Sequence, residues 1–149
     1  MKLFFAAPGW LYRSGFGWVL GRRFLSVSHR GRKSGKVRET VLEVAVYDPE
    51  IEESIVASAY GTRADWYRNL QAQPALRIRT GRSSYVPEQR MLTAEEARAA
   101  AAEFCGRHRL EARMAPRALA AIGAVDEGAF EDPVALLASL PMMAFRPKA

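Results

Sequence analysis

The chain has 149 residues, of which 49% are hydrophobic and 26% are charged, which is typical of one globular domain and excludes a disordered or fibrous protein. Its single cysteine, Cys105, excludes an intrachain disulfide, and with only two histidines it argues against a protein-built metal site. The net charge of +6 is local, because residues 22–38 hold seven Lys/Arg and no acid, while the rest holds 15 Lys/Arg against 16 Asp/Glu. We therefore expect one domain over residues 1–149, a cytoplasmic location, no metal, and one anionic ligand.

The N-terminal region is aromatic: seven of the 15 aromatic residues lie in residues 1–24. Residues 8–21 predict a loose first helix. The longest uncharged run near the N-terminus, residues 3–12, is shorter than the roughly 20 apolar residues of a membrane span, and we expect no signal peptide. Two interpretations of residues 1–23 stay open: a helix covering the mouth of the fold, or a basic, aromatic flap in peripheral contact with the inner face of the cell membrane.

Three strands are predicted in the first half of the chain. Residues 24–29 form the first, and residues 38–48 form a longer one in which apolar side chains alternate. A turn over residues 48–50 leads to a third strand over residues 54–60. A helix then follows over residues 63–73.

Thr62 is the predicted cap of that helix, Asp65 lies in its first turn, and Pro74 follows its end. Residues 75–80 and 84–92 predict a hairpin around a glycine turn, with a bulge or edge at Pro87.

The C-terminal half is mainly helical. A capping box, Thr93 to Glu96, opens a helix that ends near Gly106, and further helical residues are expected to break near Pro116 and Gly123. Another helix begins after residues 132–133, and residues 140–146 form a last strand. This order of five or six strands predicts an α+β fold, a small antiparallel split β-barrel of the FMN-binding type with peripheral helices.

The basic stretch, residues 28–40, allows three interpretations: a solvated hairpin, a phosphate cradle or a nucleic-acid patch. Two glycines allow backbone amides to approach an anion, and a serine adds a hydroxyl. The groups of the cradle are Gly31, Arg32, Lys33, Ser34, Gly35, Lys36 and Arg38. Residues 30–38 contain no aromatic side chain on which a base would stack, which argues against nucleic acid.

Common nucleotide motifs do not explain this stretch. Gly31 lies four residues before Gly35 and Val37 follows Lys36, so the phosphate loop of nucleotide hydrolases is excluded. The chain also lacks a dinucleotide-binding glycine motif and a nucleophile elbow.

A second segment, residues 56–70, passes from a strand through a glycine turn into a helix, whose N-terminus favours anions. Trp66 and Leu70 are four residues apart and are expected in the core. Helix propensity does not explain why an asparagine, Asn69, occurs inside this predicted helix.

Together the two segments resemble the deazaflavin-dependent nitroreductases of actinobacteria over residues 24–147. The shared motifs are Gly31-Arg32-Lys33-Ser34-Gly35, Ala57-Ser58, Gly61 and Trp66-Tyr67-Arg68-Asn69-Leu70. The resemblance implies a split β-barrel that binds coenzyme F(420), a deazaflavin with a phosphodiester and a polyglutamate tail; FMN is a less favoured alternative. The implied cofactor-binding residues are Gly31, Arg32, Lys33, Ser34, Gly35, Lys36, Arg38, Thr40, Ala57, Ser58, Gly61, Thr62, Trp66 and Asn69.

The resemblance also implies an activity: hydride transfer from the reduced cofactor to an apolar quinone, nitro compound or enone. A tyrosine, a serine or water supplies the proton that follows the hydride. The candidate catalytic residues are Tyr60, Tyr12 and Ser58, of which the two tyrosines are the candidates for the acceptor site. The chain has Ala59-Tyr60 where better-known relatives have a lysine, and Arg63 is a candidate replacement. Residues 86–149 contain no Tyr or Trp, which argues against nitroimidazole activation. A non-catalytic binding protein and a nucleic-acid-binding domain remain alternatives, as do a monomer and a homodimer.

Overall fold

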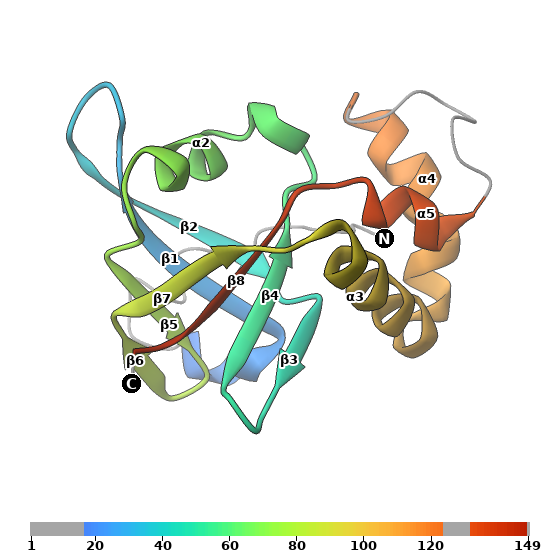
Figure 1. Ribbon diagram of the computed structural model, residues 1–149, viewed down its shortest axis with the longest axis horizontal. Helices are drawn as coiled ribbons and strands as arrows, with labels where there is room; N and C mark the ends of the chain where they lie inside the picture. The colour runs from blue at the N-terminus through green and yellow to red at the C-terminus, as the bar shows by residue number, and fades with distance from the viewer. Residues whose placement is uncertain (1–16, 124–131, 149) are drawn as a thin grey trace.

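Two four-stranded antiparallel sheets form the centre of the molecule in a computed structural model, which describes residues 17–123 and 132–148 (Figure 1). The first sheet has the order β2-β1-β5-β6 and the second has the order β3-β4-β8-β7. Apolar side chains from both sheets form one cluster, so the sheets pack face to face as a barrel. The predicted α+β split barrel is confirmed.

The first sheet is built on β1 (Phe24–Arg30), which follows the 3-10 helix η1 (Gly17–Arg23). β1 pairs with β2 (Val37–Glu43) along its whole length, from Phe24↔Glu43 to Arg30↔Val37. On its other side β1 pairs with β5 (Arg77–Thr80), and β5 in turn pairs with β6 (Ser83–Tyr85). The hairpin of β1 and β2 projects beyond the barrel, with the basic loop at its tip (Figure 1).

The second sheet contains β3 (Val46–Asp48), β4 (Glu53–Ala57), β8 (Met142–Pro147) and β7 (Pro87–Met91). The chain changes sheets three times: at tight corners between β2 and β3 and between β6 and β7, and through η2 and α2 between β4 and β5.

The single strand predicted over residues 38–48 is therefore wrong. It breaks at Val44 and Ala45, whose amides bond to the carbonyls of Arg23 and Ile55, each at 2.8 Å. The strand predicted over residues 84–92 breaks in the same way at Val86. At the first corner Val44 is buried in the barrel core and Ala45 is partly buried, so the apolar pattern continues through it, whereas Val86 at the second corner is 45% exposed.

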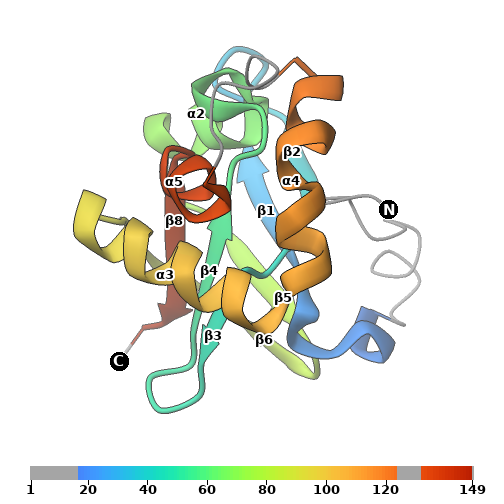
Figure 2. The same cartoon turned by 90° about the vertical axis from the view of Figure 1, so that its right-hand side faces the viewer.

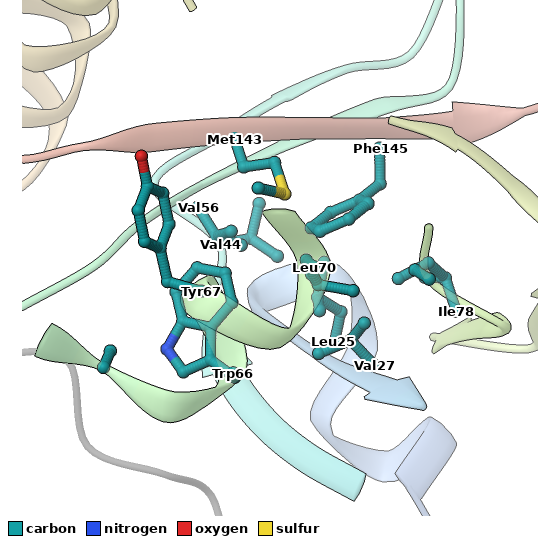
Figure 3. Packing of buried hydrophobic residues seen from close by; sticks show 12 residues of the cluster. Leu25, Val27, Val44, Val56, Trp66, Tyr67, Leu70, Ile78, Met143 and Phe145 are labelled. Atoms are coloured by element: carbon teal, nitrogen blue, oxygen red, sulfur yellow. The ribbon is translucent and has the colours of Figure 1, made fainter. Parts of the chain in front are cut away.

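Helix α2 (Asp65–Ala72) closes one end of the barrel, where its buried side chains meet those of β1, β4, β5 and β8 (Figure 3). The labelled members of this cluster are Leu25, Val27, Val44, Val56, Trp66, Tyr67, Leu70, Ile78, Met143 and Phe145. A second cluster packs α3 (Ala94–Arg107), α4 (Arg109–Ala121) and α5 (Pro133–Ala138) against Ala57 and Met142 of the second sheet (Figure 2). No helix in the described part of the chain is long and apolar enough to cross a membrane.

Two details of the helices differ from the expectation. Thr62 does not cap α2: it lies in a 3-10 turn, η2 (Gly61–Arg63), and the N-cap position is Ala64. Pro116 lies inside α4, and the helices α3 and α4 divide at His108 instead. The missing proline N–H is tolerated because the inner face of α4 is buried against its neighbours.

The predicted capping box of α3 is confirmed. The Thr93 hydroxyl accepts from the Glu96 amide at 3.2 Å, and the Glu96 carboxylate accepts from the Thr93 amide at 2.8 Å. Asp132 caps α5 by accepting from the Val134 amide at 3.0 Å.

Candidate functional site

The basic loop between β1 and β2 is held in shape by its own backbone. The Gly31 amide donates to the Lys36 carbonyl at 2.8 Å, and the Gly35 amide donates to the Gly31 carbonyl at 2.9 Å. Gly35 has a φ of 70°, and a Cβ at Gly31 would lie 2.6 Å from the Ser34 hydroxyl, so both positions favour glycine. Both amides are used inside the loop in this structure, and their bonding to a phosphate stays a prediction.

Helix α2 anchors the loop through Asn69. The carboxamide oxygen of Asn69 accepts two hydrogen bonds from Arg32, from its amide at 3.1 Å and from its guanidinium at 2.8 Å. A second guanidinium nitrogen of Arg32 lies 3.1 Å from the Asp65 carboxylate in the first turn of α2. Asn69 is only 3% exposed, so its place inside a helix is explained by this buried contact between hairpin and helix.

The network continues inward from Asn69 to the first sheet. The Asn69 carboxamide nitrogen lies 3.0 Å from Nδ1 of His29, and Nε2 of His29 lies 2.9 Å from the Thr40 hydroxyl. His29 is 2% exposed. Burial lowers the pKa of His29, the positive charge of Arg38 lowers it further, and Asp65 opposes both.

An open cleft of about 480 Å³ lies between the loop and α2. The residues that line it are Gly31, Arg32, Lys33, Ser34, Arg38, Asp65 and Asn69. Arg32 is neutralised by Asp65, but within residues 17–123 and 132–148 neither Lys33 nor Arg38 forms an ion pair. Two unpaired cations beside the Ser34 hydroxyl give a wall suited to phosphate or carboxylate groups.

The second predicted group of site residues forms a turn between β4 and α2. The Ser58 hydroxyl donates to the Gly61 carbonyl at 2.6 Å, and the Gly61 amide donates to the Ser58 carbonyl at 3.0 Å. Gly61 has a φ of 63°. Ser58 is fully buried, whereas the neighbouring Tyr60 is 52% exposed. Ser58 therefore shapes the turn, and Tyr60 presents its phenol to solvent.

The cleft brings together only some of the predicted residues. Six of them line it: Gly31, Arg32, Lys33, Ser34, Arg38 and Asn69. The predicted residues outside its lining are Gly35, Lys36, Thr40, Ala57, Ser58, Gly61, Thr62 and Trp66. Their roles toward a cofactor stay predictions, and Tyr12 lies outside the described residues.

Two further predictions concern side chains around α2. Trp66 is buried in the barrel core, edge to face with Tyr67 at 5.9 Å between ring centroids, so it supports α2 from inside. Arg63, the candidate replacement for the missing lysine, donates to the Gly123 carbonyl at 2.9 Å. In this conformation Arg63 connects the turn to the end of α4.

Sequence reasoning missed Asp65 and His29 as members of the site. Asp65 was interpreted only as a residue of the first helical turn. His29 continues the inward-facing series of Leu25 and Val27 along β1, all at most 2% exposed. A histidine on a buried strand face needs polar partners, and that was the available signal.

Solved structures share this architecture at low sequence identity. An F(420)-H(2)-dependent reductase, FDR-A, is 16% identical with a TM-score of 0.55, over 85% of this chain and 96% of that one. A protein solved as a domain-swapped dimer is 15% identical with a TM-score of 0.54, over 94% and 100%. A pyridoxamine 5'-phosphate oxidase-related, FMN-binding protein from Nostoc punctiforme is 14% identical with a TM-score of 0.52, over 95% and 81%. These likenesses define the class, a split barrel of the FMN-binding type.

The family follows from the sequence. Residues 11–115 match the model of the F(420)H(2)-dependent quinone reductase family, and no curated protein matches the chain. The chain belongs to this family and is an oxidoreductase of the F(420)H(2)-dependent type, which confirms the resemblance at the level of the family.

Proposed function

We propose that this chain binds reduced coenzyme F(420) in the cleft beside α2 and uses it to reduce an apolar, electrophilic acceptor: a quinone, a nitro compound or an enone. When bound, the coenzyme supplies a hydride from C5 of its deazaflavin ring. The protein holds the anionic tail, orients the ring and supplies a dry pocket.

The observation that carries this proposal is the pair of unpaired cations in the cleft. A ligand with a phosphodiester and several carboxylates needs positive charge that no protein carboxylate has already neutralised. Lys33 and Arg38 meet that requirement, and Lys36 adds an exposed ammonium on the same loop. Arg32 is already bound to Asp65 and Asn69, so its part is to hold the loop in place.

A proton must follow the hydride to most acceptors. Tyr60 is our first candidate because its phenol is exposed next to the turn that precedes α2. The Ser58 hydroxyl is less suited to this step, since its proton is already donated to the Gly61 carbonyl. Water remains a further source of the proton.

The test is a titration of the purified chain with coenzyme F(420), followed by the quenching of its tryptophan fluorescence. We expect saturable quenching, and then oxidation of the reduced coenzyme in the presence of menadione, nitroaromatics or enones. Quenching by FMN but not by coenzyme F(420) would refute the choice of cofactor. Binding without oxidation by any acceptor would favour a non-catalytic binding protein.

A further inference from the structure

The hydrogen bonds around Asn69 determine the protonation of His29. Arg32 only donates, so the carboxamide oxygen of Asn69 must face Arg32, and its nitrogen must face Nδ1 of His29 at 3.0 Å. That nitrogen also only donates, so Nδ1 must be the acceptor and carry no proton. The proton of a neutral imidazole then resides on Nε2, which donates to the Thr40 hydroxyl at 2.9 Å.

We propose that neutral His29 is a positioning residue for the anion cleft: it fixes the orientation of the Asn69 carboxamide, and Asn69 in turn holds Arg32 and the loop in the conformation that binds the ligand. This inference rests on the proposed function of the cleft. His29 does not line the cleft, so it acts through Asn69.

A protonated His29 is incompatible with this arrangement. The imidazolium would direct an N–H of Nδ1 at the carboxamide nitrogen, which is also a donor, and the contact would become repulsive. Turning the carboxamide over would satisfy His29 but would direct an NH₂ group at the amide and guanidinium of Arg32. Either change loses hydrogen bonds between the hairpin and α2.

The charges around His29 come from each element beside it. Arg38 lies directly opposite on β2, Arg32 belongs to the loop, and Asp65 belongs to α2. On β5 the nearest charged residue is Arg77, which pairs with Ser28 and bonds to Ser84. The arginines favour the neutral imidazole and Asp65 is the only acid among these four groups, which agrees with the lowered pKa of His29.

A first experiment measures the protonation state and the tautomer of the His29 imidazole directly, in the absence of ligand. Nitrogen NMR of the free, full-length chain at pH 7.5 should show His29 neutral, with its proton on Nε2. On acidification, the amide signal of Arg32 should shift together with the His29 titration. The inference would be overturned if the proton were found on Nδ1. It would also be overturned if the Arg32 amide signal did not shift while His29 titrates. Both results hold whether or not the cleft binds coenzyme F(420).

A second experiment measures binding of coenzyme F(420) by tryptophan quenching. His29→Leu removes the acceptor, and we expect its Kd at pH 7.5 to rise about tenfold, the effect of one lost buried hydrogen bond. His29→Asn places a carboxamide oxygen near the position of Nδ1 and cannot titrate, so it should recover most of that loss. Its recovery separates positioning from a general structural role, and it keeps the test decisive if His29→Leu fails to fold.

The pH dependence of the Kd distinguishes a positioning role of His29 from a merely structural one. Between pH 7.5 and 5.0 the Kd of the wild type should rise relative to that of His29→Asn, a ratio that cancels the ionisation of the ligand itself. A ratio that stays constant, or wild-type binding that tightens in acid, would overturn the inference while leaving the proposed function intact. A wild-type chain that does not bind coenzyme F(420) at any pH would refute the proposed function, and with it the binding part of this inference.

Discussion

Two clefts of nearly equal size differ in how their charges are used. The cleft beside the basic loop has a volume of about 480 Å³, and a second, of about 420 Å³, lies between the second sheet and α3. In the second cleft Arg90 binds Glu53 at 2.9 Å and Glu96 at 2.8 Å, and Arg107 binds Glu103 at 3.1 Å. In the first cleft Lys33 and Arg38 have no acidic partner among the residues that the structure describes.

The comparison shows that volume alone does not identify a ligand site. In the second cleft each of these cations is neutralised, and the Arg90–Glu96 pair joins the sheet to α3, whereas unpaired cations in the first cleft cost stability through mutual repulsion unless a ligand neutralises them. The predictions below test this difference by removing charge from one cleft at a time.

The largest effect is expected from Lys33→Ala combined with Arg38→Ala. In the proposed complex each side chain contributes a charge-assisted hydrogen bond to the ligand, so the Kd for coenzyme F(420) should rise about a hundredfold or more. The matched control is Arg98→Ala on α3 with Arg113→Ala on α4, two exposed residues outside both clefts, which removes the same charge elsewhere on the surface. Equal weakening by the two double variants would mean that net charge, rather than the cleft, controls binding.

The next largest effect is a loss of stability on removal of a charge from the second cleft. Glu53 is 5% exposed and is bound by Arg90 through two nitrogens, at 2.9 and 3.2 Å. Arg90→Ala leaves this carboxylate buried without its partner, and we expect about 2 kcal/mol of lost stability in urea unfolding. Binding of coenzyme F(420) should not change.

Replacing both members of that pair provides the control. Glu53→Leu with Arg90→Met removes the charge and its partner together, and it should cost less than Arg90→Ala alone. If the single variant is the more stable of the two, the pair does not contribute as we describe.

A smaller effect is expected at the start of α3, beside the second cleft. Thr93→Ala removes the side-chain half of the capping box and should lower the free energy of unfolding by about 1 kcal/mol, whereas Thr93→Ser should retain it. The Kd for coenzyme F(420) should be the same in both. A change in binding would show that the two clefts communicate.

The smallest effect is expected in the pH dependence of the free energy of unfolding, which should differ between the wild type and His29→Asn. The pKa of His29 is lowered in the folded protein, so its contribution to stability is complete above the ordinary histidine pKa of about 6.5 and falls as the pH drops toward the lowered value. The pKa of Glu96 is lowered by its bond to the Thr93 backbone and by Arg90, so its contribution falls only in more acidic solution. Urea unfolding of the wild type and of His29→Asn between pH 7.5 and 5.0 should diverge. If the free energies of unfolding of the two proteins changed in parallel with pH, His29 would not be the group whose lowered pKa contributes to stability.

Much of the fold could be predicted from local pattern. The capping box at Thr93, the start of a helix at residues 132–133 and the strand before the basic loop each depend on neighbouring residues, and all are confirmed. The corner at Val44 was missed because it is defined by bonds to Arg23 and Ile55, which alternation does not encode.

The site was predictable only in part for a similar reason. The charge of Lys33 and Arg38 is visible in the sequence, but their lack of partners depends on where the acids lie in space. The bond between Arg32 and Asp65 spans 33 residues and that between His29 and Asn69 spans 40. Such contacts are set by the packing of hairpin against helix, so neither Asp65 nor His29 could be assigned from sequence spacing.

The β1–β2 hairpin carries the proposed ligand site at its tip and strand pairing along the rest of its length. Its register is set by seven consecutive residue pairs, from Phe24↔Glu43 to Arg30↔Val37. Lys33 and Lys36 lie beyond the last pair, and Arg38 lies in the pair before it, opposite His29. Substitutions at the tip can therefore retune the preference for short or long anionic tails while strand pairing inside the barrel stays as it is. The exchangeable positions of the loop are Lys33 and Lys36, because Arg32 is held by Asn69 and Asp65 of α2.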